Sequence, residues 1–137
     1  LKRSEARRTR QTVKDALDSI AYEGAVRHVP RSLDASPSSA WERALSAVDT
    51  YQNGAYWHTP TGWLIEALLP VSPELAKRVF ADYISHLRRG DFRAGGQNQA
   101  PWECFGREGK AAQNGVYMTS VALPLAVLDR LIAGDRR

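Results

Sequence analysis

The predicted fold depends on the stretch Tyr51-Gln52-Asn53-Gly54-Ala55-Tyr56-Trp57-His58-Thr59-Pro60. An almost wholly apolar run over residues 63–69 follows it directly. Thr59 can cap a helix there, and Pro60 fits the first helical position, where proline's missing N–H is harmless. Because the run is apolar on nearly every side, we expect a buried inner helix that ends at Pro70.

The next segment predicts an amphipathic outer helix. Ser72 is its expected N-cap, Pro73 fits its first position, and Gly90 is its expected stop. Apolar residues between these bounds keep the spacing of three and four that marks one buried face. They are Leu75, Ala76, Val79, Phe80, Tyr83, Ile84 and Leu87.

Part of the opening stretch returns later in the chain. The segment at 52–56 reappears at 113–117 as Gln113-Asn114-Gly115-Val116-Tyr117. Each copy precedes an apolar helix, the second expected from about Met118 to Ala133 with a kink at Pro124. Asn-Gly pairs accept positive φ and let a chain turn sharply. The echo therefore predicts αα-hairpin repeats, which bury each other's faces when they stack.

The remaining segments complete an expected single all-α domain over residues 1–137. Residues 1–24 predict an N-terminal helix that Gly24 ends, and residues 25–50 predict a loop with a short helix at 41–48. Residues 51–137 would then hold two inner helices, one outer helix and a long loop at 90–114. Loops of that length without regular structure are usually functional or disordered.

Composition and charge narrow the function classes. The net charge is +4, but much of it lies at the two ends, which ranks a nucleic-acid partner last. Cys104 is the only cysteine, so no intrachain disulfide can form. No apolar run is long enough to span a membrane, and no signal-peptide core is present, so we expect a soluble chain. No metal or other cofactor is expected, because the three histidines lack ligand spacing.

Four segments resemble the C-terminal portion of bacterial six-hairpin glycosidases. They are Gly24-Ala25-Val26-Arg27-His28-Val29-Pro30, the stretch 51–63, Ala100-Pro101-Trp102-Glu103-Cys104-Phe105 and Tyr117-Met118-Thr119-Ser120-Val121. The resemblance implies an (α/α)6 toroid, in which inner helices surround a sugar pocket at one rim. A chain of 137 residues supplies only part of such a ring. We therefore expect a partial toroid with long loops on one rim, and either a missing N-terminal portion or self-association.

The resemblance also implies a carbohydrate ligand and selects candidate site residues. Glycoside hydrolysis usually needs two carboxyl groups. Glu103, beside an indole in the long loop, is the first candidate for the acid or base, and Glu66 in the inner helix is the second. Both have a plainer interpretation as solvated glutamates, and the nearby aromatic residues as core. The candidate substrate-binding residues are Tyr56, Trp57, His58, Trp102, Gln97, Asn98, Arg27 and His28.

Two functions follow from these expectations. The first is a glycoside hydrolase-like carbohydrate-processing domain that uses carboxylate acid–base chemistry and is inactive or weak as an isolated chain. The alternative is a non-catalytic carbohydrate-binding or scaffold module that keeps the aromatic rim without the acid pair. A basic helical nucleic-acid binder, resting on Arg7, Arg8 and Arg10, ranks third.

Overall fold

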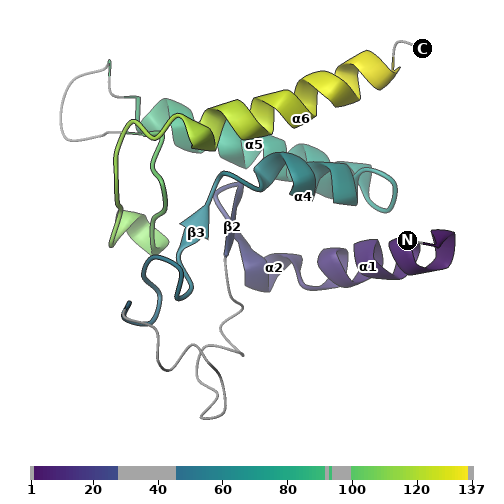
Figure 1. The fold of residues 1–137 in the computed structure, drawn as a ribbon, viewed down its shortest axis with the longest axis horizontal. Helices are drawn as coiled ribbons and strands as arrows, with labels where there is room; N and C mark the ends of the chain where they lie inside the picture. Colours follow the sequence, from purple (N-terminus) through teal and green to yellow (C-terminus); the bar gives the residue numbers. More distant parts are fainter. Residues whose placement is uncertain (1, 28–45, 92, 94–99, 136–137) are drawn as a thin grey trace.

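The computed structural model describes residues 2–27, 46–91, 93 and 100–135 (Figure 1). The elements in these ranges are α1 (Arg3–Asp15), α2 (Leu17–Ile20), β1 (Ala21–Tyr22), β2 (Ala25–Arg27), β3 (Tyr56–Trp57), α4 (Thr61–Leu68), α5 (Pro73–Arg89), the 3₁₀ helix η3 (Arg107–Gly109) and α6 (Thr119–Asp135). Among them, no helix combines the length and the apolar character that crossing a lipid bilayer requires.

The prediction of an all-α partial toroid is wrong. The strands form an antiparallel sheet in the order β1-β2-β3, which connects the N-terminal helices to the rest of the fold. The helix expected to run to Gly24 ends at Ile20 instead. Glu23 and Gly24 both have positive φ, 50° and 74°, and form the two-residue turn of the β1–β2 hairpin. Positive φ at both central positions is typical of tight hairpin turns, so the chain reverses there as a sheet.

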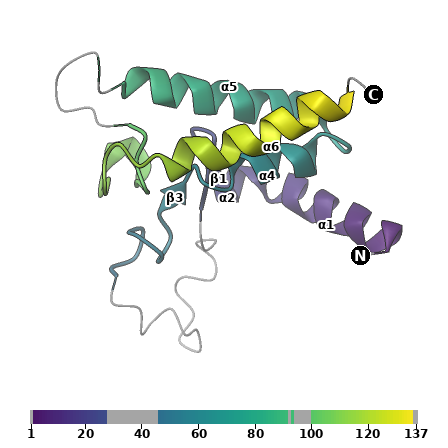
Figure 2. The same ribbon diagram turned by 45° about the horizontal axis from the view of Figure 1, so that its top comes forward.

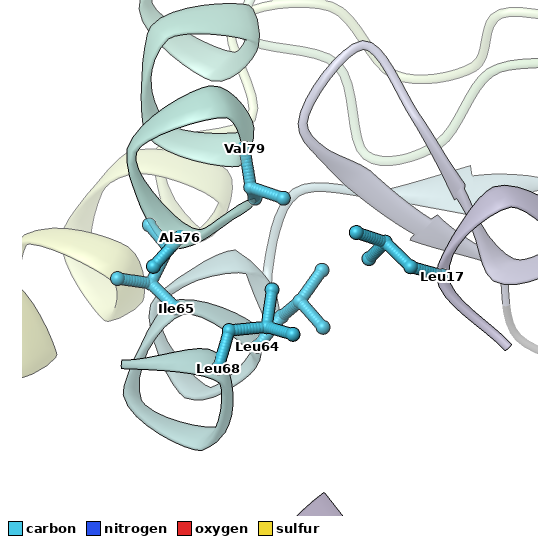
Figure 3. Close-up of a cluster of buried hydrophobic side chains, with 6 residues drawn as sticks. All are labelled: Leu17, Leu64, Ile65, Leu68, Ala76 and Val79. Atoms are coloured by element: carbon cyan, nitrogen blue, oxygen red, sulfur yellow. The ribbon is translucent and has the colours of Figure 1, made fainter. Parts of the chain in front are cut away.

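The described helices pack around one central helix, and no ring of hairpins is evident. The α4 helix contacts α5, α6 and α1, and lies between them in Figures 1 and 2. Its buried apolar side chains meet those of α2 and α5 in the main core (Figure 3). This core consists of Leu17, Leu64, Ile65, Leu68, Ala76 and Val79.

The two Gln-Asn-Gly segments do not form a structural repeat. In the first copy only Gly54 has positive φ, at 104°. In the second copy Asn114 and Val116 have positive φ, at 46° and 58°. The first copy runs into strand β3, whereas the second leads into α6 after a short irregular stretch. Similar sequences therefore turn the chain differently, and the echo does not establish stacked hairpins.

The helix predictions differ in outcome. The expected outer helix is α5, and its predicted bounds at Ser72, Pro73 and Gly90 are confirmed. The expected inner helix is α4, but it is not buried all round, because Trp63 is 51% exposed. The last expected helix is α6, and the buried Pro124 lies inside it as expected. Of the short helix expected over residues 41–48, the structure describes only residues 46–48, and these are not helical.

The small sheet separates two apolar clusters. Side chains alternate between the faces of a strand, and directly paired residues share a face. Ala21 pairs with Val26, and both pack against the helical core. On the other face, Ala25 and Tyr56 cluster with Phe105, which comes from the long loop after α5. The sheet therefore connects the helical core to the loop segment that bears the candidate site.

Candidate functional site

A polar pocket of about 640 Å³ opens where the sheet meets the loop after Phe105. Two of the predicted substrate-binding residues, Arg27 and Tyr56, line it. The full lining is Ser19, Arg27, Asp49, Thr50, Tyr56, Gly106, Arg107, Glu108, Lys110 and Ala111. We call this hollow the polar pocket.

Strand pairing places the residues of the pocket floor. Arg27 is directly opposite Tyr56 in the β2–β3 ladder, so both side chains leave the same face of the sheet. Tyr56 also pairs with Phe105 through two backbone hydrogen bonds of 2.8 and 3.0 Å. Arg107 lies two residues further on, and the Cζ atoms of Arg27 and Arg107 both lie 5.9 Å from the centre of the Tyr56 ring. The ring is thus flanked by two guanidinium groups.

A tight loop from Gly106 to Lys110 forms one wall of the pocket. The Gly106 N–H donates to the Lys110 carbonyl at 2.6 Å, and the Lys110 N–H donates to the Arg107 carbonyl at 3.2 Å. A Cβ atom at Gly106 would stand 2.7 Å from the Lys110 carbonyl oxygen, so glycine permits this closure. The loop therefore holds the backbone of Arg107 in a defined place.

Two of the three cationic side chains in the pocket have a carboxylate partner among the described residues, and the third has none. Arg27, only 7% exposed, forms an ion pair with Asp49. Lys110 lies 2.9 Å from Glu108, and this hydrogen bond lowers the pKa of the glutamate. Arg107 forms no ion pair with any residue that the structure describes, and its guanidinium lies over the rings of Tyr22 and Tyr56. The pocket thus carries one positive charge that no described carboxylate balances.

The two predicted catalytic carboxylates lie elsewhere and apart. Glu103 is 9% exposed, and its Oε2 accepts a hydrogen bond from the Asn114 side chain. Its backbone N–H is shared between the carbonyls of Gln113 and Asn114, at 3.1 and 3.2 Å. Glu66 is half-buried on α4 and forms a 2.9 Å ion pair with Arg130 of α6. Neither residue lines the polar pocket, and the structure does not bring the two together in one hollow.

His58 is completely buried, so it does not reach a surface rim. Its Nε2 lies 3.0 Å from the Glu23 carbonyl oxygen, which can only accept, so Nε2 bears the proton. Nδ1 is then unprotonated, and it has no hydrogen-bond partner among the described residues. Burial lowers the pKa of His58 to about 3. The side chain therefore anchors the β1–β2 turn as a neutral imidazole.

The same turn is held by two further side chains that the sequence did not indicate. The Glu23 carboxylate accepts a hydrogen bond from His86 Nδ1 and another from Arg89, both at 2.5 Å. The ring centres of His58 and His86 lie 4.8 Å apart. Burial lowers the pKa of His86. Glu23 is more than 60 positions away from its partners on α5. No local pattern in a sequence marks a contact of that separation.

The two tryptophans predicted to bind substrate, Trp57 and Trp102, pack against other residues of the fold. Trp57 donates from Nε1 to the Tyr51 carbonyl at 3.4 Å, and its ring centre lies 5.4 Å from that of Tyr51. Trp102 packs beside the cluster of Ala25, Tyr56 and Phe105. Neither tryptophan lines the polar pocket. The other predicted binding residues, namely His28, Gln97 and Asn98, lie outside the described residues.

A second hollow is an apolar groove of about 1000 Å³ along α4, α5 and α6. Exposed apolar side chains on its margins include Leu69, Phe80, Leu125 and Ile132. Exposed apolar surface of this kind is consistent with an interaction surface, but it does not identify what binds. The expected self-association stays a prediction, which sedimentation of the purified chain over a range of concentrations would test.

Two observations on the described residues concern metal ligands and the one thiol. Within those ranges, no group of three His, Cys, Asp or Glu side chains is arranged to hold a metal ion. Cys104 is buried, which raises the pKa of its thiol to about 11 and keeps it protonated at neutral pH. A protonated, inaccessible thiol is a poor nucleophile.

Comparison with protein-family models, with curated proteins and with solved structures found no match to this chain. The resemblance to six-hairpin glycosidases therefore stays a prediction from the residues alone.

Proposed function

We propose that this chain is a carbohydrate-binding domain whose ligand occupies the polar pocket. The volume of about 640 Å³ lies within the usual range of small-ligand sites, which is about 300–1,000 Å³. Sugar hydroxyl groups both donate and accept hydrogen bonds. The pocket offers donors on Arg27 and Arg107 and acceptors on Asp49 and Glu108, around a nearly buried tyrosine ring. The gathering of cationic and acidic side chains around one hollow is the observation that carries the proposal.

The arrangement supports binding better than hydrolysis. A general acid must hold a proton at the working pH. The two carboxylates that line the pocket, Asp49 and Glu108, each face a cation, and the pKa of Glu108 is lowered. Glu103 and Glu66 lie outside the pocket. We therefore favour the non-catalytic function over the glycosidase.

A pocket-filling substitution tests the binding function. Ala111→Phe places a large ring in the lining of the polar pocket, where Ala111 is exposed. Ala122→Phe controls for the added surface ring, because Ala122 is an exposed alanine on α6 that lines neither hollow. Calorimetric titration with a panel of neutral and acidic oligosaccharides should show binding to the unsubstituted chain. We expect at least about a tenfold weaker affinity in Ala111→Phe, equivalent to about 1.4 kcal/mol, and no change in the control.

An activity assay tests the expectation that the chain binds sugars without hydrolysing them. The chain should not release the chromophore from aryl glycosides that match any bound sugar. Turnover that disappears in Glu103→Gln would contradict the binding-only function and restore Glu103 as the acid or base. Loss of sugar binding in both phenylalanine variants would instead indicate that the pocket is not where the ligand binds.

A further inference from the structure

We infer that the carbohydrate bound in the polar pocket is acidic, and that Arg107 binds its carboxylate. This inference rests on the proposed function and specifies its ligand class. Both acidic side chains of the pocket are paired with a cation, but not every cation is paired with an acid. Asp49 is paired with Arg27 and Glu108 with Lys110, whereas Arg107 has no carboxylate partner among the described residues. A ligand with one negative charge would complete the set.

The surroundings of Arg107 suit it to this task. Its Cζ atom lies 5.0 Å from the centre of the Tyr22 ring and 5.9 Å from that of Tyr56. Contact with aromatic faces holds a guanidinium group without using the N–H groups that point outward in its plane. Those N–H groups form a planar fork that matches the two oxygens of a carboxylate. Arg107 is therefore oriented by carbon surfaces, while its donors stay available.

The same surroundings favour a sugar acid over other anions. With Asp49 and Glu108 already paired, the one excess positive charge of Arg107 matches a ligand with one negative charge better than a doubly ionised phosphate. For a uronic acid the two carboxylates act as acceptors for its hydroxyl groups, while Ser19 and Thr50 add two hydroxyl groups to the lining. One carboxylate beside several hydroxyls, as in a glucuronide or a galacturonide, thus matches both the charge and the polarity of the pocket.

The experiment compares matched sugars that differ only at one carbon. Methyl glucuronide is titrated against methyl glucoside, and methyl galacturonide against methyl galactoside, with chemical shifts of the backbone amides as the readout. We expect at least one acid to bind about tenfold more tightly than its neutral match, in line with one charge-assisted hydrogen-bond pair. Arg107→Gln should remove this preference. Arg130→Gln, which replaces an exposed arginine on α6, should keep it.

Each other outcome has a separate meaning. If acids and neutral sugars bind equally, the inference is overturned while the proposed function stands. If Arg107→Gln keeps the preference for the acid, another residue recognises the carboxylate and the inference is likewise overturned. If sodium acetate or sulfate competes as well as the sugar acid, the pocket recognises charge alone, which also overturns it. If none of the four sugars binds, the proposed function itself fails.

Discussion

Gly24→Ala is expected to remove much of the stability of the fold. Gly24 has φ of 74°, and a Cβ atom there would lie 2.4 to 2.6 Å from the backbone and Cβ atoms of Tyr83. Such a contact forces the hairpin turn and α5 apart. The left-handed backbone and the overpacking together should lower the free energy of unfolding by about 2–5 kcal/mol. Since small domains are stable by only about 5–15 kcal/mol, part of the variant should be unfolded at room temperature.

Gly109→Ala is the matched control for this prediction. Gly109 has nearly the same φ, 71°, but no atom lies within 4 Å of the position that a Cβ would occupy. The control should lose only the backbone contribution, about 1–2 kcal/mol. Urea denaturation followed by circular dichroism measures both variants. Equal losses in the two would contradict the close approach of the hairpin turn to α5.

Acidification is expected to destabilise the fold well before the carboxylates titrate. Burial lowers the pKa of His58 from 6.5 to about 3, while the unfolded chain keeps the ordinary value. Between these two pH values the unfolded state binds a proton that the folded state does not. The free energy of unfolding therefore falls as the pH falls below 6.5, by about 1.4 kcal/mol per pH unit for His58. His86, whose pKa burial also lowers, should add to the slope.

Charged and titratable side chains surround the two histidines. Glu23 and Arg89 face His86, and Tyr83 lies beside His58 with its ring centre 5.0 Å away. Burial raises the pKa of Tyr83 to about 12, so it does not titrate in the acid range. Urea denaturation at a series of pH values between 4.5 and 7.5 gives the slope. His58→Gln keeps a hydrogen-bond donor but has no titrating group. The variant should lose about 1.4 kcal/mol per pH unit of the slope, the contribution of one proton, whatever the variant's overall stability. An unchanged slope would show that His58 takes up its proton equally in the folded and unfolded states, and would contradict the lowered pKa.

The parts of the fold that sequence predicted are those with strong local signals. The bounds of α5 were predictable because the signals for helix ends, here Ser72, Pro73 and Gly90, act within one helical turn. The sheet was missed because its strands have two or three residues, which is too short to show alternation. The sequence predicts Gly24 as a helix stop, whereas its positive φ forms part of a hairpin turn. The non-glycine Glu23 beside it gave no sign of adopting positive φ.

The candidate site was predictable only in part, for a similar reason. Tyr56 and Arg27 were among the predicted binding residues, and both line the polar pocket. Arg107 was missed because the bridge between Tyr56 and Phe105 brings it to Tyr56 from a distant part of the sequence. Asp49 was missed because its ion pair is with Arg27, 22 positions away. His58 belongs to the same aromatic block as Tyr56, yet it lies in the interior and holds the hairpin turn. Residue type alone did not separate the two positions.

The central claim is that a carbohydrate binds in the polar pocket. Mapping of backbone amide shifts during titration with methyl glucuronide and methyl galacturonide, and with their neutral counterparts, tests it most directly. We predict saturable shifts at residues 49–50 and 106–111, which vanish in Ala111→Phe and persist in Ala122→Phe. Shifts confined to the apolar groove of α4, α5 and α6, or no saturable shifts with any of these sugars, would contradict the account.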